Sequence, residues 1–424
     1  MKNLLRTIVA RMLALVARTV VRRYHPHVVM VTGSVGKTST KDAVAAVLSP
    51  RFLVRKSEKS FNSEFGVPFT ILGVGNPWGN PLAWVLVVKR ALALLLLPNH
   101  YPNMLVLEVG ADRPGDLARI LRTATPDAVV VTRLPEIPVH VEAYASPEAV
   151  REEEFSPAYA LAADAPLIIS ADDPYSLDSS VRTVARIISY GTASDATIRV
   201  SDSDFYEEEG RVVGMRAHIT IAEKEQSLVV KGSVGLTQLL PAAAALAVAG
   251  AFGVPLSEAL AAFQDYEPPA GRGRLLLGVH DSIIIDDSYN ASPAAVEEAL
   301  TTLQKFPHAK RRIAVLGDML ELGRYSAMEH ERIGTLAADS ADLVVAVGIR
   351  ARVFAALMGK VEMMQFDNAV TAAKELPALI QEGDVILVKG SQSIRTERIV
   401  EALLANPSDA SLLVRQEREW KKRK

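Results

Sequence analysis

One short run near the N-terminus combines the residue types that bind the phosphates of a nucleotide. Residues Val28–Thr40 read VVMVTGSVGKTST: an apolar β-branched run, a turn bounded by Gly33 and Gly36, and then Lys37 and Thr38 at the start of a predicted helix. This order brings backbone N–H groups, a helix N-terminus, an ammonium and a hydroxyl to one point, which suits phosphates and Mg²⁺. The usual motif, G-x-x-x-x-G-K, would place a glycine where this chain has Val31. We therefore predict a phosphate loop with a tighter turn.

Further segments carry side chains with chemical potential at the ends of predicted strands. They are Phe61–Thr70 with Asn62, Leu107–Gly115 with Glu108, Pro138–Glu142 with His140, Ile284–Pro293 with paired carboxylates, and the glycine-flanked loops Val315–Gly323 and Val388–Ser393. Open α/β sheets bind ligands at the carboxyl ends of their strands. Taken singly, each has a plainer explanation, because Glu108 could be a solvated strand end, His140 a loop histidine, and Asp286 with Asp287 a helix N-cap pair.

Alternating apolar runs and helical patterns predict the elements that position these side chains. Expected strands are Val28–Thr32, Met104–Val109, Ala128–Thr132, Leu167–Ser170, Ser282–Ile285, Arg312–Leu316, Leu343–Val347 and Val385–Val388. Strands that alternate with helices indicate mostly parallel sheets with covering helices. Short alternating runs between about 195 and 234 predict an antiparallel insert, and Pro241–Phe252 predicts a buried, alanine-rich helix.

The segment Tyr266–Arg274 is dense in turn-forming residues and is the best candidate for a linker. We expect an α/β protein with an N-terminal helix over 1–27, a central phosphate-loop domain with a mostly parallel sheet over 28–270, and a Rossmann-like α/β domain over 271–424.

Composition narrows the class of protein. The chain has 424 residues, 49% hydrophobic and 23% charged, which is long enough for about two or three globular domains. A net charge of −2 gives no reason to expect nucleic acid as a partner, and the absence of cysteine excludes disulfides, thiolate metal sites and a cysteine nucleophile. We expect a cytoplasmic monomer.

Two apolar segments raise the question of a membrane. Residues 1–23 are interrupted by Arg6, Arg11 and Arg18 and lack a cleavage site, and residues 82–97 are interrupted at Lys89 and Arg90. About 20 uninterrupted apolar residues are needed to span a bilayer. One interpretation is that the two helices pack on each other or on the domain. The other is a peripheral patch on an anionic membrane surface.

Together and in this order, the chemical segments resemble the Mur ligase family. The segments that carry the resemblance are Asn62–Pro68, Asp286–Ala291, Leu316–Gly323 and Val388–Ser391, and it extends over about residues 27–405. It implies an ATP- and Mg²⁺-dependent enzyme of peptidoglycan precursor synthesis that joins a carboxylate to an amine through an acyl phosphate. The resemblance is strongest to members that add D-alanyl-D-alanine to a UDP-N-acetylmuramoyl-tripeptide.

The resemblance also implies roles for particular residues. Lys37 would hold the β- and γ-phosphates, and the turn Gly33, Ser34, Val35 and Gly36, followed by Thr38 and Ser39, would surround them. Thr38 and Glu108 would bind one Mg²⁺, and His140 would lie at a second metal. Asp287, Tyr289 and Asn290 would meet the nucleotide from the second domain, and Arg272 would contact phosphate when the domains close. Asn62, Asp318 and Lys389 would lie toward the substrates.

Three departures from the family pattern affect these expectations. Glu154 stands where members usually carry a carbamylated lysine, and we expect its carboxylate to supply the same charge, directly or through a water. The alternative is a solvated acidic helix turn. Thr237 and Pro241 stand where relatives commonly have the histidine and asparagine that help to hold adenine. Relatives also have a UDP-binding domain before the phosphate loop, whereas here about 27 residues precede the first predicted strand.

Two alternatives therefore remain at the level of the sequence. A Mur-type ligase could act on a different carboxylate and amine, which the short N-terminal region favours and the second-domain loops disfavour. A degenerate relative could bind a nucleotide and serve as a scaffold, with Glu154, Thr237 and Pro241 as signs of decay.

Overall fold

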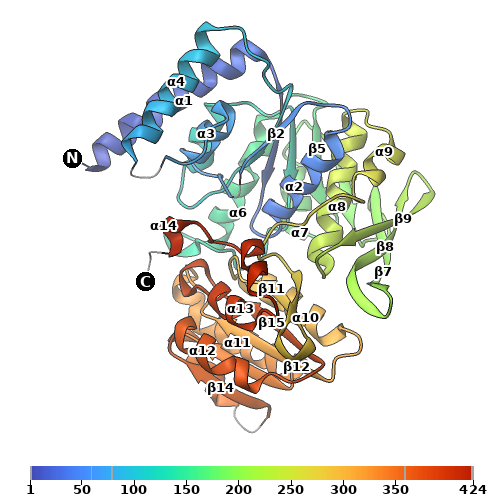
Figure 1. Cartoon of the computed structure of the whole chain (residues 1–424). Coiled ribbons are helices and arrows are strands. Elements are labelled where there is room, and N and C mark those ends of the chain that lie inside the picture. Colours follow the sequence, from blue (N-terminus) through green and yellow to red (C-terminus); the bar gives the residue numbers. More distant parts are fainter. Residues whose placement is uncertain (1, 59, 78–79, 358–359, 422–424) are drawn as a thin grey trace.

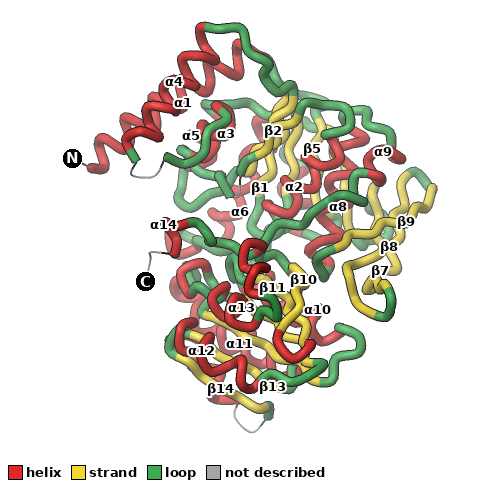
Figure 2. Tube along the Cα trace, viewed as in Figure 1, coloured by secondary structure: helices red, strands yellow, loops and turns green. Residues whose placement is uncertain are grey.

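The protein is described by a computed structural model that covers residues 2–58, 60–77, 80–357 and 360–421. Its strands form two sheets, one in each half of the chain, and helices cover both (Figures 1 and 2). The predicted fold class, a phosphate-loop domain with a mostly parallel sheet followed by a second α/β domain, is confirmed.

The first sheet has nine strands in the order β2-β3-β1-β4-β5-β6-β7-β8-β9. Strands β2 to β7 pair in parallel, and β7, β8 and β9 pair antiparallel. This confirms the antiparallel insert that the alternating pattern predicts. The strands are β1 His27–Thr32, β2 Val54–Lys56, β3 Met104–Glu108, β4 Ala128–Val131, β5 Pro166–Ser170, β6 Arg186–Gly191, β7 Ile198–Glu208, β8 Arg211–Ile221 and β9 Lys224–Lys231.

Side-chain alternation along β1 divides the apolar core into two layers. Val29 and Val31 point into the cluster that contains α2 (Lys37–Leu48) and α8 (Leu236–Ala251). Val28 and Met30 point to the opposite face, where α1 (Lys2–Tyr24), α3 (Gly66–Leu72) and α4 (Pro81–Leu96) lie. Both faces of β1 are therefore covered, as a continuous apolar run in a parallel sheet requires.

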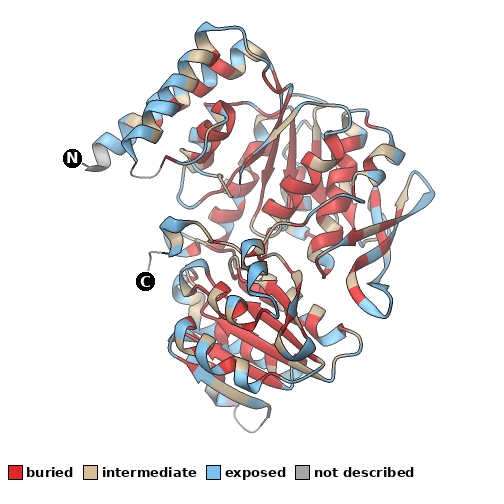
Figure 3. Ribbon diagram, in the orientation of Figure 1, coloured by how far each residue is buried: buried red, intermediate tan, exposed pale blue. Residues whose placement is uncertain are grey.

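The helix predicted at Pro241–Phe252 begins five residues earlier, at Leu236, so that Pro241 lies inside it. Proline lacks the N–H that would bond to the carbonyl one turn back, and it is tolerated more readily near the first turn than deep in a helix. The alanines that follow are buried and let α8 approach α2 and the sheet closely (Figure 3).

The second sheet has six strands in the order β10-β11-β15-β12-β13-β14, parallel except for β10. They are β10 Arg274–Gly278, β11 Ser282–Asp287, β12 Arg311–Gly317, β13 Leu343–Val347, β14 Glu362–Phe366 and β15 Asp384–Lys389. All eight expected strands occur, whereas β2, β6, β10 and β14, which lie at sheet edges or carry exposed residues, were not predicted.

The remaining α-helices connect these strands or, in the case of α13 and α14, follow the last strand, β15. They are α5 Asp116–Leu121, α6 Pro147–Phe155, α7 Pro174–Ser180, α9 Leu256–Ala261, α10 Pro293–Lys305, α11 Ser326–Ser340, α12 Ala369–Glu375, α13 Glu397–Leu403 and α14 Arg418–Lys421.

The predicted linker, Tyr266–Arg274, connects the part of the chain that forms the first sheet to β10 of the second sheet. Gly271 and Gly273 both have positive φ, 66° and 68°. A Cβ at Gly273 would lie 2.7 Å from the carbonyl oxygen of Val234, so that only glycine fits where the linker passes the start of α8.

The apolar segments at 1–23 and 82–97 form α1 and α4, which lie side by side (Figure 1). Within the described residues, neither these helices nor any other is long and apolar enough to cross a membrane.

Candidate active site

The site lies at the carboxyl ends of β1, β3 and β4, which are neighbours in the first sheet. The phosphate loop follows β1, Glu108 ends β3, and Thr132 follows β4. Parallel strands deliver these side chains to one edge, the usual ligand site of an open α/β sheet.

Gly33 gives the loop its tight turn. Its φ is 111°, and a Cβ there would lie 2.4 Å from Thr132 Oγ1, so both backbone conformation and space require glycine. The amides of Ser34 and Val35 donate to the carbonyl of Arg133, at 3.0 and 3.4 Å. These two amides are thus used by the protein, and the expectation that the Gly33–Gly36 turn surrounds phosphates stays a prediction.

Helix α2 begins directly after the loop and supplies the other amides. Gly36 is its N-cap residue, with a φ of 89° and no side-chain cap, and the first intrahelical bond runs from Thr40 N to Gly36 O. The amides of Lys37, Thr38 and Ser39 therefore precede the first helical bond and present the positive end of the helix dipole. Such an end is a ready anion site.

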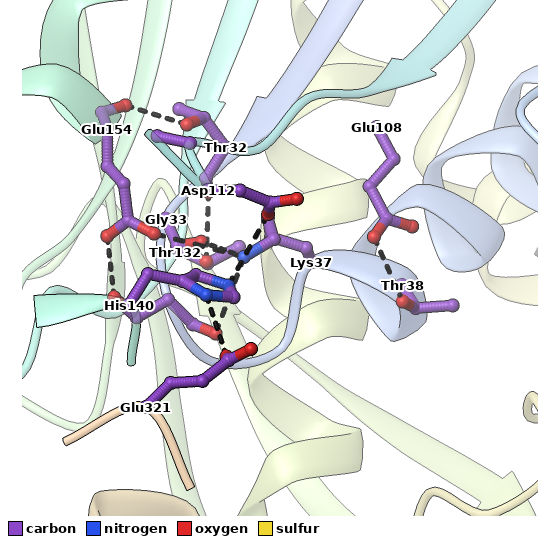
Figure 4. Close-up of polar contacts among 12 residues, drawn as sticks. Thr32, Gly33, Lys37, Thr38, Glu108, Asp112, Thr132, His140, Glu154 and Glu321 are labelled. Atoms are coloured by element: carbon purple, nitrogen blue, oxygen red, sulfur yellow. Dashed lines mark hydrogen bonds and ion pairs between the residues drawn. The ribbon is translucent and has the colours of Figure 1, made fainter. Parts of the chain in front are cut away.

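The Lys37 ammonium lies over its own loop. Nζ donates to the carbonyl oxygen of Gly33 and to that of Ser34, and it lies 3.9 Å from Glu154 Oε1 (Figure 4). A phosphate group entering here would meet a cation already held at the loop.

Glu154 lies at the end of α6 and is 1% exposed. Ser34 Oγ donates to its Oε2 at 2.5 Å, and Thr32 Oγ1 donates to its backbone oxygen at 2.7 Å. Burial raises the pKa of Glu154, and the Lys37 charge and the Ser34 hydroxyl offset only part of this shift. The alternative of a solvated acidic turn is wrong for Glu154, although the neighbouring Glu152 fits it and pairs with Arg182 at the surface.

Thr38 and Glu108 form an oxygen pair beside the loop. Thr38 Oγ1 donates to Glu108 Oε1 at 3.2 Å (Figure 4). It also lies 3.2 Å from Ser60 Oγ. Glu108 is 1% exposed, and its Oε2 is a buried oxygen with no hydrogen-bond partner among the described residues. An orphaned carboxylate oxygen beside a hydroxyl is the kind of donor set that Mg²⁺ accepts, so these residues fit the expected metal.

Lys41, one turn after Lys37, was missed by the sequence reasoning. It is 1% exposed, donates to the Ser57 carbonyl at 2.9 Å, and lies 3.2 Å from Asp42 and 3.9 Å from Glu108 Oε2. It supplies the charge that allows Glu108 to be buried as a carboxylate. The apolar residues that follow it on the same helix face, Val44, Ala45 and Leu48, are the signal that the sequence offers.

His140 lies at the contact between the two halves of the chain. Its backbone φ is 66°, its Nδ1 is 2.8 Å from Glu321 Oε2, and its Nε2 is 3.5 Å from Asp112 Oδ1 (Figure 4). Burial disfavours the protonated ring, but the hydrogen bond and charge of Glu321, together with the charge of Asp112, outweigh it and raise the pKa of His140. The same hydrogen bond lowers the pKa of Glu321.

The two expected metal positions are Thr38 with Glu108, whose oxygens fit Mg²⁺, and His140, where the structure gives less support. In the described part of the chain, no group of three or more His, Cys, Asp or Glu residues converges as a metal cluster. A second metal at His140 therefore stays a prediction, since both of its ring nitrogens face carboxylates of Asp112 and Glu321.

Arg272 joins the linker to the phosphate loop. Its Nη2 donates to Thr38 Oγ1 at 3.3 Å, and its guanidinium lies 4.1 Å from the centre of the Tyr289 ring. Its Nε is buried without a hydrogen-bond partner among the described residues. The structure thus brings Arg272, Thr38 and Tyr289 together across the two halves.

The loop after β11 is fixed from behind by buried cations. Lys389 Nζ donates to Asp287 Oδ2 at 2.6 Å and to the carbonyl oxygen of Asn290 at 3.0 Å. Arg415 donates to the carbonyl oxygens of Ser288 and Tyr289. Arg415 was not predicted, because nothing local in the C-terminal sequence indicates which loop it reaches.

The residues expected to face the substrates have internal partners. Asp318 is 5% exposed and accepts from the amides of Ile349 and Ala351, at 3.2 and 2.8 Å. Lys389 is 2% exposed. Asn62 lies beside Gly110, and the Gly110 amide donates to the backbone carbonyl oxygen of Asn62 at 3.1 Å. Substrate contact by Asn62, Asp318 and Lys389 stays a prediction.

A cavity of about 340 Å³ lies between the first sheet, the start of α8 and α10. Arg133, whose carbonyl holds the loop, lines it together with Gly235, Leu236, Thr302 and Glu298. The side chain of Arg133 forms an ion pair with Glu298 of α10, which also lines the cavity. The start of α8 is therefore one wall of this cavity, and Arg133 connects the cavity to the phosphate loop.

The fold and the site define a class: a phosphate-loop domain joined by a short linker to a second α/β domain whose loops meet the phosphate loop. Residues 31–249 match the Mur ligase middle domain, and residues 271–392 match the Mur ligase, glutamate ligase domain. The chain belongs to the Mur ligase family.

Curated relatives agree with this assignment. The chain is 29% identical over 399 residues to a UDP-N-acetylmuramoyl-tripeptide–D-alanyl-D-alanine ligase of Bacillus subtilis, covering 92% of this chain and 79% of the relative. It is 30% identical to the protein of the same name from Mycobacterium leprae, covering 89% and 74%.

Solved structures show the same architecture. A MurF ligase from Thermotoga maritima in complex with ADP aligns with a TM-score of 0.76 and 26% identity, covering 93% of this chain and 83% of that one. A MurF from Acinetobacter baumannii aligns with a TM-score of 0.77 at 20% identity, which shows the fold alone.

Proposed function

We propose that the chain is an ATP-dependent ligase that adds D-alanyl-D-alanine to a UDP-N-acetylmuramoyl-tripeptide in peptidoglycan precursor synthesis. The observation that carries this proposal is the meeting of Lys37, the Thr38–Glu108 pair and Arg272 at one edge of the first sheet. The substrates are those for which the relatives are named.

The reaction of such a ligase has two steps. The carboxylate of the acceptor attacks the γ-phosphorus of ATP, the bond to the β-phosphate oxygen breaks, and ADP leaves. The amine then attacks the carbonyl carbon of the acyl phosphate, a C–N bond forms, and inorganic phosphate leaves as the amine loses a proton. The protein contributes positioning and neutralisation of charge.

Individual residues take roles that match their contacts. Lys37 and the first amides of α2 bind the phosphates, and Arg272 reaches the same point from the linker. Mg²⁺, held by Thr38 and Glu108, would neutralise phosphate charge. Lys41 keeps Glu108 in place.

Glu154 takes the place of the carbamylated lysine, as a fixed negative charge behind Lys37 and Ser34. A carboxylate that is already part of the chain needs no CO₂. Activity should therefore be the same in CO₂-depleted and bicarbonate-supplemented buffer.

The nucleotide base enters the cavity beside the loop, between the start of α8 and α10. Support comes from Arg133, which belongs both to the cavity wall and to the hydrogen bonds of the loop. Thr237, in the first turn of α8, stands in place of the family's histidine, so backbone and α10 contacts carry more of the recognition here.

Phosphate release from ATP tests the proposal. We expect release with UDP-N-acetylmuramoyl-tripeptide and D-alanyl-D-alanine together and a small fraction of that rate with either alone. Activity only with another acid–amine pair would contradict the substrate assignment. Bound ATP with no release under any pair would contradict an enzymatic role.

A further inference from the structure

Helices α1 and α4 form a pair at one end of the molecule, away from the second sheet (Figure 1). One side of each helix is packed: Leu13, Ala17 and Val20 of α1 and Val87 and Leu94 of α4 belong to the core cluster that also contains α3. Tyr24 Oη donates to the Leu94 carbonyl at 2.9 Å and ties the two helices together. The two helices are thus packed against the domain and against each other.

The other side of α1 carries an exposed apolar stripe. Leu5, Ile8, Met12 and Leu15 are 63%, 46%, 63% and 66% exposed. Their spacing of three and four residues places them on one face of the helix. This face is opposite to the side that packs, because the buried residues follow the same period half a turn away.

Helix α4 repeats the arrangement. Its exposed apolar residues are Leu82, Val85, Leu86, Val88, Leu92 and Leu96, each at least 51% exposed. Single exposed apolar residues are ordinary on a protein surface, but contiguous groups of them mark an interaction site. The pale blue outer sides of both helices are visible in Figure 3.

Charge distinguishes the occupants that such a surface could have. Residues 1–41 and 65–107 contain no Asp or Glu, although the whole chain has a net charge of −2. Arg11, Arg18 and Arg22 are exposed along the border of the apolar stripe on α1. Lys89 is exposed among the apolar residues of the stripe on α4. The charged side chains that α1 and α4 themselves carry are therefore all cationic; Glu64, outside both helices, lies 3.9 Å from Arg6 and 3.6 Å from Arg119.

We propose that the outer surface of α1 and α4 binds peripherally to an anionic lipid bilayer. Leucine, isoleucine and methionine side chains would enter the boundary between headgroups and acyl chains, while arginine and lysine stems extend to the phosphates. Anionic headgroups complement the cationic border. A second copy of the chain would instead bring two cationic borders together. The proposal is independent of the ligase reaction.

Co-sedimentation with vesicles tests the proposal on the full chain. We expect binding to vesicles of phosphatidylglycerol and phosphatidylcholine, and at least tenfold weaker binding to phosphatidylcholine alone. Raising salt from about 0.1 M to about 0.5 M should weaken binding to the anionic vesicles, because exposed charges are screened.

Two variants separate the surface from general effects. The double variant Met12→Glu, Leu92→Glu changes one exposed residue on each helix and should lose at least tenfold in vesicle affinity. The double variant Val181→Glu, Val184→Glu, at sites 79% and 71% exposed outside the two helices, adds the same charge; it is the matched control and should bind like the unchanged protein. Circular dichroism and ligase rate in the absence of lipid should be the same for all three.

Absence of binding to anionic vesicles, or equal binding by the double variant, would overturn the proposal. So would a concentration-dependent dimer in analytical ultracentrifugation that the double variant abolishes, because the surface would then be an interface between copies.

Discussion

Replacing Glu154 by glutamine should separate catalysis from stability. The change keeps the size of the side chain and removes its charge. Glu154 faces the Lys37 ammonium at 3.9 Å and accepts a 2.5 Å hydrogen bond from Ser34. At an effective dielectric constant of about 20, a unit charge pair at this separation interacts by about 4 kcal/mol, and a hydrogen bond to a charged group contributes about 1.5–3 kcal/mol.

Only part of this energy should appear in the rate. Burial of Glu154 opposes its charged form, and the neutral amide can still accept a hydrogen bond from Ser34. We expect a loss of about 2–3 kcal/mol in transition-state stabilisation, a fall of roughly 30- to 150-fold in kcat/KM.

Stability should move in the other direction. The pKa of Glu154 is raised in the folded protein, so Glu154 binds a proton more readily in the folded state than in the unfolded chain. Proton binding therefore stabilises the folded state at low pH, and this stabilisation is lost as pH rises through the folded pKa. At neutral pH, glutamine removes the cost of a buried charge. The Tm of Glu154→Gln should therefore equal or exceed that of the unchanged protein.

The assay is phosphate release with both substrates, beside thermal denaturation of the same preparations. Glu152→Gln is the matched control, since Glu152 lies in the same helix but pairs with Arg182 at the surface, and its rate should be unchanged. A Glu154→Gln variant with the full rate would refute the role of Glu154. A fall in rate matched by a fall in Tm would show that the residue acts only through the fold.

Three further predictions follow from other contacts. Arg272→Lys keeps the charge but loses the planar stack on Tyr289 and the reach to Thr38, so kcat/KM should fall about 10- to 100-fold with little change in Tm; an unchanged rate would remove Arg272 from the site. Lys41→Met leaves Glu108 and Asp42 without their buried cation and should lower the free energy of unfolding in urea by about 3 kcal/mol, whereas Lys56→Met, at a half-exposed neighbour that also pairs with Asp42, should cost less than about 1 kcal/mol; equal losses would contradict the buried-pair account. Burial raises the pKa of Asp286 to about 6, so the stability that its protonated form contributes should be lost as pH rises from about 4 to about 6. Asp286→Asn should remove this contribution from the pH dependence of the free energy of unfolding and be at least as stable at pH 7; an identical pH dependence in both proteins would contradict it.

The parts of the site that a sequence can predict are those that depend on local order. Strand, glycine turn and lysine at 28–37 predict the phosphate loop, because the helix that follows must direct its first amides at the loop. Glu108 is predictable as the last residue of a buried strand. The eight expected strands are largely buried on both faces of their sheets, so each appears in the sequence as a continuous apolar run.

Contacts made across the fold could not be predicted in this way. The pair of His140 and Glu321, the approach of Arg272 to Thr38, and the support of the Tyr289 loop by Arg415 each join residues that are far apart in the sequence. The edge strands β2 and β14 were missed because their exposed positions break the apolar run. The burial of Glu154 depends on how α6 lies against the phosphate loop, which its acidic sequence does not indicate.

An oxygen-transfer measurement tests the ligase reaction most directly. The acceptor tripeptide is labelled with ¹⁸O in its terminal carboxylate, and the phosphate released with ATP and D-alanyl-D-alanine is examined by mass spectrometry. Transfer of a phosphoryl group to that carboxylate predicts one labelled oxygen in each phosphate released, with an amide formed in equal amount. Unlabelled phosphate, or label in phosphate without amide, would contradict the account.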